Sequence, residues 1–192
     1  MKDEQAQHHV GRNADAVGGQ FRSVMCRLAS GVSIITAGKD DDITGMTVTS
    51  LASLSADPPR LLVNIHRQTS SFPLIQRDRR FAVNILGSDQ REIADRFSNG
   101  SLKGKQRFEN VAWSAGQSGM PLLGQALATV ECEVDEIIER FSHGIVIGRL
   151  LSIALSDRLS SLVYWDGQYV EIKRNDDLDL FVDVGVPLVH VR

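Results

Sequence analysis

The first part of the chain changes from a helical to a strand-like hydrophobic period. Apolar residues recur at helical spacing from Phe21 to Leu28, which predicts an amphipathic helix over about 19–29. Gly31 follows, where a helix usually stops. From Val32 the apolar residues follow a strand pattern, so we expect the chain to enter a sheet there.

Short strands and helices then succeed one another. Strands are expected from Val32, over Thr44–Leu54, Leu61–Ile65 and Phe81–Leu86, with a polar turn at 39–42 and a break at Asp57-Pro58-Pro59. A helix is expected from Ser70 or Ser71, with Pro73 in its first turn, to about Asp78. Ser88 is expected to cap a second helix, which ends at Asn99-Gly100, and residues 98–120 are expected to form a long loop.

The clearest alternation begins at Ala126. Alternate residues Ala128, Val130, Cys132 and Val134 are apolar, while the residues between them, including Glu131, are polar. This pattern predicts a half-buried antiparallel strand. A turn at Ser142-His143-Gly144 should lead to a second long strand over Ile145–Leu155, followed by a final short strand at Leu162–Trp165.

These elements predict a mainly β fold, a small antiparallel barrel decorated with helices. No GxGxxG follows a strand and no GxxxxGK[ST] occurs, which argues against a Rossmann or P-loop fold. The net charge of -3 argues against nucleic-acid binding, and no apolar run is long enough to cross a membrane. We therefore expect a cytoplasmic protein. Cys26 and Cys132 form no ligand cluster and are expected to be buried thiols.

Two segments carry candidate binding chemistry. Residues 45–53 place many hydroxyls on a strand, where they can bind phosphate or ring carbonyls, and Gly45 would let a flat ring approach the backbone. Residues 64–71 end a strand and open a helix, so their free N–H groups and Arg67 suit an anion. An ordinary polar strand is the alternative for the first segment, and a simple helix cap is the alternative for the second.

A histidine and an aromatic group stand apart from these segments. His143 lies at the turn between the two long strands, where a solvated side chain is the alternative. Tyr164, Trp165 and Tyr169 form an aromatic group near the end, which packing against the barrel also explains. No Ser/His/Asp triad and no HExxH-type metal spacing is present in the sequence.

Taken together, four segments resemble the short-chain flavin reductases, the reductase components of two-component flavin-dependent monooxygenases. The segments are FRSVMCRLASGVSIIT from Phe21, GMTVTSLASLSADPPRLL from Gly45, FAVNIL from Phe81, and GQYVEI after Leu162-Val163-Tyr164. Their order and spacing match over about residues 20–172. The resemblance implies an FMN-binding split barrel, usually a homodimer, that reduces FMN or FAD with NADH or NADPH. The reduced flavin would pass to a partner monooxygenase.

The resemblance also implies site residues. The flavin ring and ribityl chain would lie against Thr47, Val48, Thr49, Ser50 and Ser53. The phosphate end would lie against Ile65, His66, Arg67, Ser70 and Ser71. The far end of a larger flavin would lie against Phe97 and Ser98. The nicotinamide would lie near His143, the candidate catalytic residue, and near Tyr164 and Tyr169.

Two features depart from the family pattern. The family often has Gly-Asp-His where this chain has Phe141-Ser142-His143, so the carboxylate before the histidine is missing. Residues 174–192 extend beyond the usual family end and are expected either to pack on a dimer partner or to cover the site. Residues 1–17 are expected to form a flexible arm, and residues 18–173 the domain. A non-catalytic flavin-binding protein for storage, sensing or electron relay is the alternative, and a split barrel that binds haem or acts on a corrinoid is a more distant one.

Overall fold

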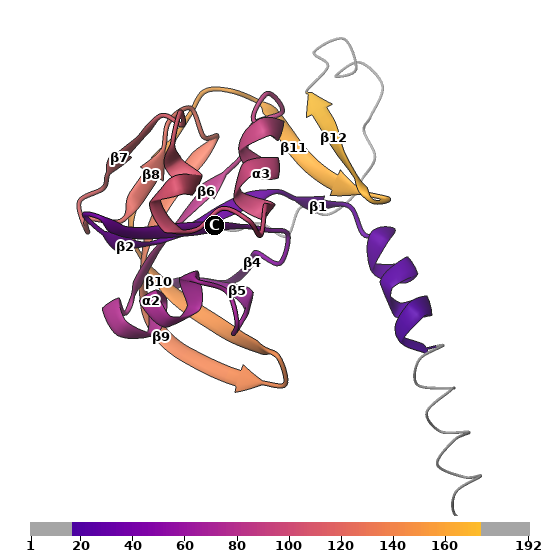
Figure 1. Cartoon of the computed structure of the whole chain (residues 1–192), viewed down its shortest axis with the longest axis horizontal. Coiled ribbons are helices and arrows are strands. Elements are labelled where there is room, and N and C mark those ends of the chain that lie inside the picture. The colour runs from indigo at the N-terminus through magenta and orange to yellow at the C-terminus, as the bar shows by residue number, and fades with distance from the viewer. Residues whose placement is uncertain (1–16, 174–192) are drawn as a thin grey trace, which may run out of the picture.

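The computed structural model describes residues 17–173 and shows the predicted mixture of antiparallel strands and short helices (Figure 1). A helix over residues 17–26 comes first. The elements that follow are β1 (Ser30–Gly31), β2 (Ser33–Lys39), β3 (Asp42–Val48), β4 (Ala52–Ala56), β5 (Pro59–His66), α2 (Ser71–Asp78), β6 (Arg80–Ile85), α3 (Arg91–Ser98), the 3-10 helix η1 (Gly104–Phe108), β7 (Trp113–Ala115), β8 (Pro121–Leu123), β9 (Ala128–Arg140), β10 (His143–Leu155), β11 (Ser160–Trp165) and β12 (Gln168–Lys173).

The main sheet has the order β3-β2-β6-β9-β10-β5-β4, and all six pairings between neighbouring strands are antiparallel. Its two edge strands, β3 and β4, are consecutive in the chain and are joined by residues 49–51. The sheet therefore curls into a barrel that is open between β3 and β4. Smaller sheets, β1-β11-β12 and β7-β8, lie beside it.

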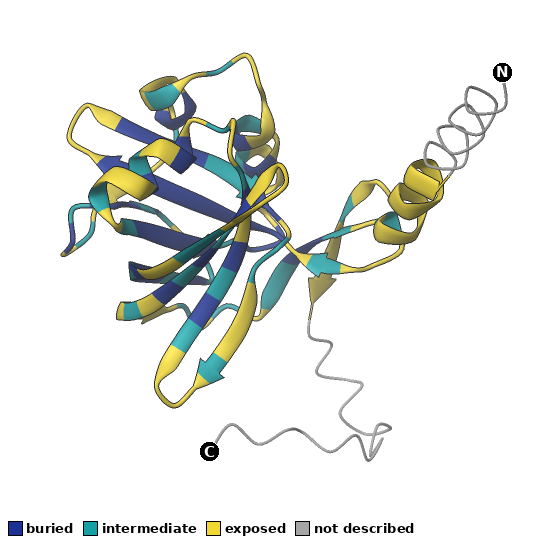
Figure 2. Cartoon of the chain, turned by 90° about the horizontal axis from the view of Figure 1, so that it is seen from below, coloured by how far each residue is buried: buried dark blue, intermediate teal, exposed yellow. Residues whose placement is uncertain are grey.

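Two hydrophobic clusters hold this arrangement together, and Figure 2 shows the buried stretches along the strands. The first fills the barrel, where Phe81, Val83 and Val146 are fully buried. The second lies between the sheet and α3, η1 and β11, and contains Ile34, Phe97 and other fully or nearly fully buried residues. Apolar burial of this kind is the main favourable contribution to folding.

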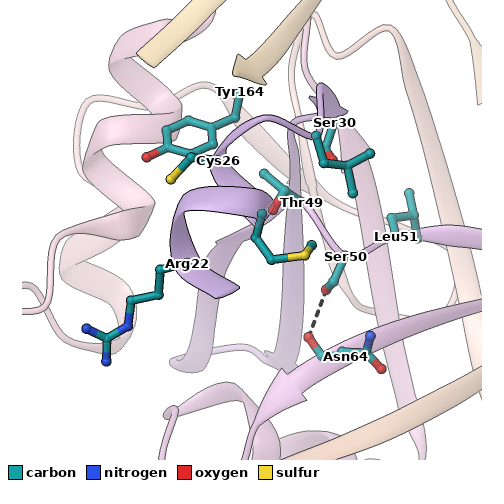
Figure 3. A pocket seen from close by; sticks show the side chains of 10 residues that line it. Arg22, Cys26, Ser30, Thr49, Ser50, Leu51, Asn64 and Tyr164 are labelled. Carbon is teal, nitrogen blue, oxygen red and sulfur yellow. Dashed lines mark hydrogen bonds between the residues drawn. The ribbon is translucent and has the colours of Figure 1, made fainter. Parts of the chain in front are cut away.

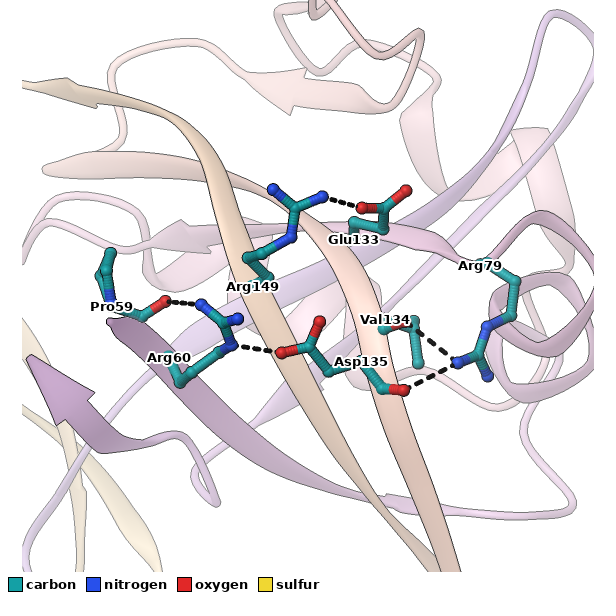
Figure 4. Close-up of polar contacts among 7 residues, drawn as sticks. All are labelled: Pro59, Arg60, Arg79, Glu133, Val134, Asp135 and Arg149. Atoms are coloured by element: carbon teal, nitrogen blue, oxygen red, sulfur yellow. Dashed lines mark hydrogen bonds and ion pairs between the residues drawn. The ribbon is translucent and has the colours of Figure 1, made fainter. Parts of the chain in front are cut away.

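Ion pairs and hydrogen bonds also connect β9 to its neighbours (Figure 4). Arg60 of β5 pairs with Asp135 of β9, and Arg149 of β10 pairs with Glu133 of β9. Beyond the end of α2, the Arg79 guanidinium donates to the carbonyls of Val134 and Asp135 at 3.0 and 3.1 Å. These contacts tie α2 and β5 to the central strand β9.

Several sequence predictions are confirmed in detail. The turn at 39–42 forms, the helix expected from Ser70 or Ser71 runs from Ser71 to Asp78, and the strand expected over Phe81–Leu86 runs from Arg80 to Ile85. Ala128, Val130, Cys132 and Val134 are buried as the alternation predicts. The mainly β, split-barrel fold is confirmed as a whole.

Other predictions about single elements are wrong. The strand expected over Thr44–Leu54 is two strands, because the chain leaves one edge of the barrel at residue 49 and joins the opposite edge at Ala52. The long loop at 98–120 contains η1 and β7, and β7 pairs with β8. Leu162–Trp165 is followed by a further strand, β12, and Gln90 rather than Ser88 stands at the N-cap of α3.

Glu131 is the clearest error in the predicted burial pattern. Its side chain was expected to point to solvent with the other polar residues of the strand, yet the residue is only 2% exposed. It lies under the turn that joins β7 to β8, where Ser118 and Ser152 donate hydrogen bonds to its carboxylate. The apolar tail at 174–192 and most of the predicted arm at 1–17 lie outside the described residues; residue 17 itself is helical.

Candidate functional site

A cavity of about 680 Å³ lies at the opening between β3 and β4 (Figure 3). The barrel contributes Thr49, Ser50 and Leu51 from the linker between the edge strands, and Asn64 from β5. Tyr164 of β11 lines another side. The remaining lining residues come mainly from the N-terminal helix and the turn after it: Arg22, Met25, Cys26, Leu28 and Ser30. The volume lies in the range of sites for small organic ligands.

Hydroxyl groups are fixed at this opening by bonds to the backbone. The Ser50 hydroxyl donates to the carbonyl of Asn64 at 2.9 Å, which joins the linker to β5. The Thr47 hydroxyl donates to the carbonyl of Ala94 at 2.7 Å, which joins β3 to α3. Because each proton is already used, each oxygen is left to accept a hydrogen bond from a ligand N–H or O–H group.

A second cavity of about 530 Å³ adjoins the first, since Thr49 and Tyr164 line both. It lies between the end of β3, helix α3 and the β11–β12 hairpin. Its other lining residues are Thr47, Val48, Arg91, Asp95, Ser98, Gly167, Gln168 and Tyr169. Burial, followed by the nearby Asp95 carboxylate, raises the pKa of Tyr169, so its phenol stays protonated at neutral pH.

The predicted phosphate turn has a compact hydrogen-bond pattern. The Thr69 N–H and hydroxyl both donate to the carbonyl of His66, at 3.0 and 2.8 Å. The Ser70 hydroxyl lies 2.8 Å from that of Thr44 on β3. Ser71 is fully buried at the start of α2, and its hydroxyl has no hydrogen-bond partner within the described part of the chain. A buried hydroxyl without a partner is costly unless something else satisfies it.

Arg67 does not point freely from this turn. Its guanidinium donates to Glu139 at 2.9 Å and to the carbonyl of Phe141, both at the tip of the β9–β10 hairpin. The predicted phosphate contact of Arg67 would therefore have to replace an existing ion pair.

His143 lies on the same hairpin and faces His66, its register partner on β5. The two imidazole rings meet edge to face, with centroids 5.0 Å apart. The Ser142 hydroxyl lies 2.9 Å from Nδ1 of His143, and the Gln68 N–H donates to Nδ1 of His66 at 3.2 Å. Both rings are thus held by neighbours, although neither lines either cavity. His143 is not brought together with Tyr164 and Tyr169 in the single chain.

Several residues predicted for the site are buried in the structure. Ile65 and Phe97 are core residues, and Val48 is largely buried at the edge of the second cavity. Ser53 lines a separate cavity of about 310 Å³ beside Arg60 and Leu150. The reading of Gly45 as a place for a flat ligand ring is wrong, because a Cβ there would lie 2.7 Å from the Phe97 ring; the glycine serves the packing of α3.

The sequence reasoning missed residues that come to the site from elements read as packing. The apolar period of the N-terminal helix predicted a buried face, but Met25 and Leu28 line the first cavity. Arg91 and Asp95 carried no motif, and their spacing on one helix face was the available signal; Gln168 lies in the GQYVEI segment but was given no role. Cys132 is buried as predicted, and that burial raises its pKa to about 12, whereas Cys26 lines the first cavity.

The open antiparallel barrel, with a ligand-sized cavity at the gap between its edge strands, is a split barrel. The model of the flavin reductase like domain matches residues 25–173, and the chain belongs to this family. The family and the enzyme class predicted from the sequence, flavin reductase, are thereby confirmed. Within residues 17–173, no helix combines the length and apolar character that a membrane crossing requires.

Curated relatives and solved structures agree with this family. An FMN reductase (NADH), RutF 2, of Rhizobium rhizogenes is 31% identical over 150 residues, which cover 78% of this chain and 86% of the relative. The reductase component of an FADH(2)-dependent resorcinol hydroxylase of Rhizobium sp. is 34% identical over 157 residues, covering 81% and 87%. The Streptomyces globisporus NADH:FAD oxidoreductase SgcE6, solved with NAD and FAD fragments, superposes with a TM-score of 0.76 at 26% identity, covering 82% and 94%.

Proposed function

We propose that this protein is an NAD(P)H:flavin oxidoreductase that reduces FMN or FAD and supplies the reduced flavin to a partner monooxygenase in the cytoplasm. The observation that carries the proposal is the cavity of about 680 Å³ at the barrel opening, which is lined by hydroxyls and an aromatic ring. Relatives described as an NADH-dependent FMN reductase and as the reductase component of a hydroxylase support the reaction and the type of partner.

The described residues fit a flavin. The linker residues Thr49, Ser50 and Leu51 offer backbone groups and a hydroxyl oxygen to the polar edge of the ring. At the other end, the first turn of α2 offers N–H groups for a phosphate, and the buried Ser71 hydroxyl, which has no partner within the described residues, would have to become accessible to donate there. Asn64 lies between these two places along β5, so one molecule would span them.

The reaction needs little acid or base from the protein. The cofactors supply the chemistry, in which a hydride passes from C4 of the reduced nicotinamide to N5 of the flavin. The protein's part is to hold the two rings in contact and to exclude water. Tyr164 borders both cavities and would form one wall of that contact, while Met25 and Leu28 would shield it from solvent.

A homodimer is part of this proposal. Figures 1 and 2 show the N-terminal helix projecting from the barrel, and its apolar residues Phe21 and Val24 are 63% and 65% exposed. Leu151, Ile153 and Leu155 at the end of β10 are also exposed. Apolar surface of this extent is usually covered by another protein surface, and a second copy would also close the outer wall of the first cavity.

NADH oxidation at 340 nm by the purified protein, with and without added FMN or FAD, tests the proposal. We expect turnover that depends on added flavin, and the ratio of kcat/KM for the two flavins ranks them. Flavin binding without NADH turnover would contradict the reductase and favour the non-catalytic flavin-binding protein. Absence of both binding and turnover would reject both functions.

A further inference from the structure

One residue, Arg67, fastens the turn expected to hold the flavin phosphate to the tip of the β9–β10 hairpin. Its N–H group donates to the carbonyl of Ser142 at 2.9 Å. Its guanidinium donates to the Glu139 carboxylate at 2.9 Å and to the carbonyl of Phe141. Three bonds from a single residue therefore join the turn to the segment of the hairpin that leads into His143.

Glu139 also connects this tip to helix α2. Its Oε2 atom accepts from Arg67, and its Oε1 atom accepts from the side-chain amide of Gln76 on α2 at 3.1 Å. Among the described residues, Glu139 is the one carboxylate that pairs with Arg67. Since α2 begins at Ser71, soon after the turn, this carboxylate holds the hairpin against both the turn and the helix that follows it.

The segment held in this way positions the candidate nicotinamide histidine. The Ser142 hydroxyl lies 2.9 Å from Nδ1 of His143, and the His143 ring meets the ring of His66, the residue before Arg67. Ser142 stands where the family often has an aspartate, so no carboxylate directly precedes His143 in this chain. Glu139 brings a carboxylate to the same tip, but it acts on His143 only through Arg67 and the backbone.

A phosphate at the turn would compete with Glu139 for the Arg67 guanidinium. The two side chains are each 44% exposed, and an exposed ion pair of this kind contributes little to stability. A phosphate monoester carries more negative charge than a carboxylate, and the planar guanidinium can bind it through two parallel hydrogen bonds. The existing pair is therefore weak enough for a bound phosphate to replace it.

We propose that Glu139 is a positioning residue for His143, and that a flavin phosphate releases its hold by taking Arg67. In the paired state the hairpin tip is held where His143 lines neither cavity. The phosphate can bind Arg67 fully only in the released state, and this difference shifts the equilibrium toward release. The reduced nicotinamide would then meet His143 after the flavin is bound. This inference rests on the proposed reductase function.

Riboflavin and FMN test the inference, because the two flavins differ only in the phosphate. With each flavin at saturation, we expect the KM of the wild type for NADH to be about threefold lower with FMN, the size of effect that exchanging one exposed ion pair allows. Glu139→Gln keeps an oxygen for Gln76 but loses the charge that holds Arg67, so its two KM values should be equal.

Glu136→Gln is the matched control for this comparison. It removes the same charge from the same strand, and within residues 17–173 Glu136 makes no ion pair or side-chain hydrogen bond. The threefold difference between the flavins should therefore remain in Glu136→Gln. A difference that disappears equally in both variants would show an effect of net charge and would overturn the inference.

Hydrogen exchange of the hairpin tip gives a readout that does not depend on turnover. In the wild type, FMN should speed the exchange of peptides that contain Ser142 and His143 relative to riboflavin, or relative to the flavin-free protein if riboflavin does not bind. In Glu139→Gln this exchange should already be fast without the phosphate.

The outcomes separate this inference from the proposed function. Equal KM values and equal exchange with the two flavins in the wild type, or a threefold difference that persists in Glu139→Gln, overturn the role of Glu139 and leave the reductase intact. A wild type that does not oxidise NADH with FMN would instead reject the proposed function.

Discussion

Two regions of this molecule are rich in hydroxyl side chains but use them in opposite ways. Around Glu131, inside the fold, the carboxylate accepts hydrogen bonds from the Ser118 and Ser152 hydroxyls and from the N–H groups of Gln117 and Ser118. At the barrel opening, the Thr49 and Ser50 side chains face a cavity with capacity to accept further bonds. The first region is satisfied within the chain; the second is not.

The difference shows which polar residues serve stability and which are available to a ligand. Burial alone raises the pKa of the Glu131 carboxyl, but the surrounding donors outweigh that effect and hold the pKa below its ordinary value. A buried charge with all its partners fixes a turn in place and has no capacity left for a substrate. The rim of the barrel keeps exposed polar atoms beside apolar side chains, as binding sites do.

The largest effect is expected inside the fold. Glu131→Gln turns an amide NH2 group toward N–H donors, so we expect unfolding to become easier by about 3 kcal/mol. Flavin affinity of the folded variant should not change. Urea unfolding followed by fluorescence measures the loss, and Glu133→Gln on the same strand, which breaks an exposed pair with Arg149, should cost less than about 1 kcal/mol.

The stability difference between the wild type and Glu131→Gln should also depend on pH. The pKa of Glu131 in the folded protein lies below its ordinary value of 4.5. The ionised carboxylate therefore stabilises the folded state fully above pH 4.5, and this stabilisation is lost as the pH falls through the folded pKa. The gap in stability between wild type and Glu131→Gln should therefore narrow below pH 4.5. An unchanged gap, or equal stability of the two proteins at pH 7, would show that the cluster is not the stabilising element described.

The next effect is expected at the rim. Phe21→Glu places a charge on the exposed apolar face of the N-terminal helix, and we expect the dimer Kd to rise about 30-fold, or about 2 kcal/mol. Sedimentation at several concentrations measures this, with Lys105→Gln on η1, where Lys105 pairs with Asp41, as a control. A wild type that is monomeric at all concentrations would contradict the proposed homodimer, whereas barrel stability should be the same in all three proteins.

The same contrast explains what the sequence could and could not predict. Val130, Cys132 and Val134 were assigned correctly because burial on one sheet face imposes a period of two. Glu131 was misplaced because the period cannot show that a turn from β7 to β8 covers the other face. Thr49 and Ser50 were found through hydroxyl density and the family resemblance, but Arg91 and Gln168 come from elements 77 residues apart, and only the folded chain brings them to one cavity.

The smallest effect is expected at Ser142, where a change in the KM for NADH would show that its hydroxyl orients His143 and does not simply pack at the hairpin. Ser142 occupies the position where the family often has an aspartate, and its hydroxyl lies 2.9 Å from Nδ1 of His143. Phe141, which precedes it, has a φ of 52° and is 94% exposed. Phe141 therefore has the left-handed backbone conformation that the family's glycine adopts more easily. If the hydroxyl replaces the carboxylate in holding the imidazole, Ser142→Ala should raise the KM for NADH two- to fivefold, less than about 1 kcal/mol, with little change in kcat or flavin affinity.

A second variant, Ser142→Asp, restores the carboxylate that the family often has at this position. A carboxylate can accept from Nδ1–H more strongly than a hydroxyl, so we expect Ser142→Asp to bind NADH at least as well as the wild type. Steady-state kinetics of the three proteins at fixed flavin concentration measure the order. Equal KM values for the wild type and Ser142→Ala would mean that the bond at Nδ1 does not position His143 for the nicotinamide. Because His143 lines neither cavity of the single chain, a KM effect would also require that a second subunit, or movement of the hairpin, brings it to the rim.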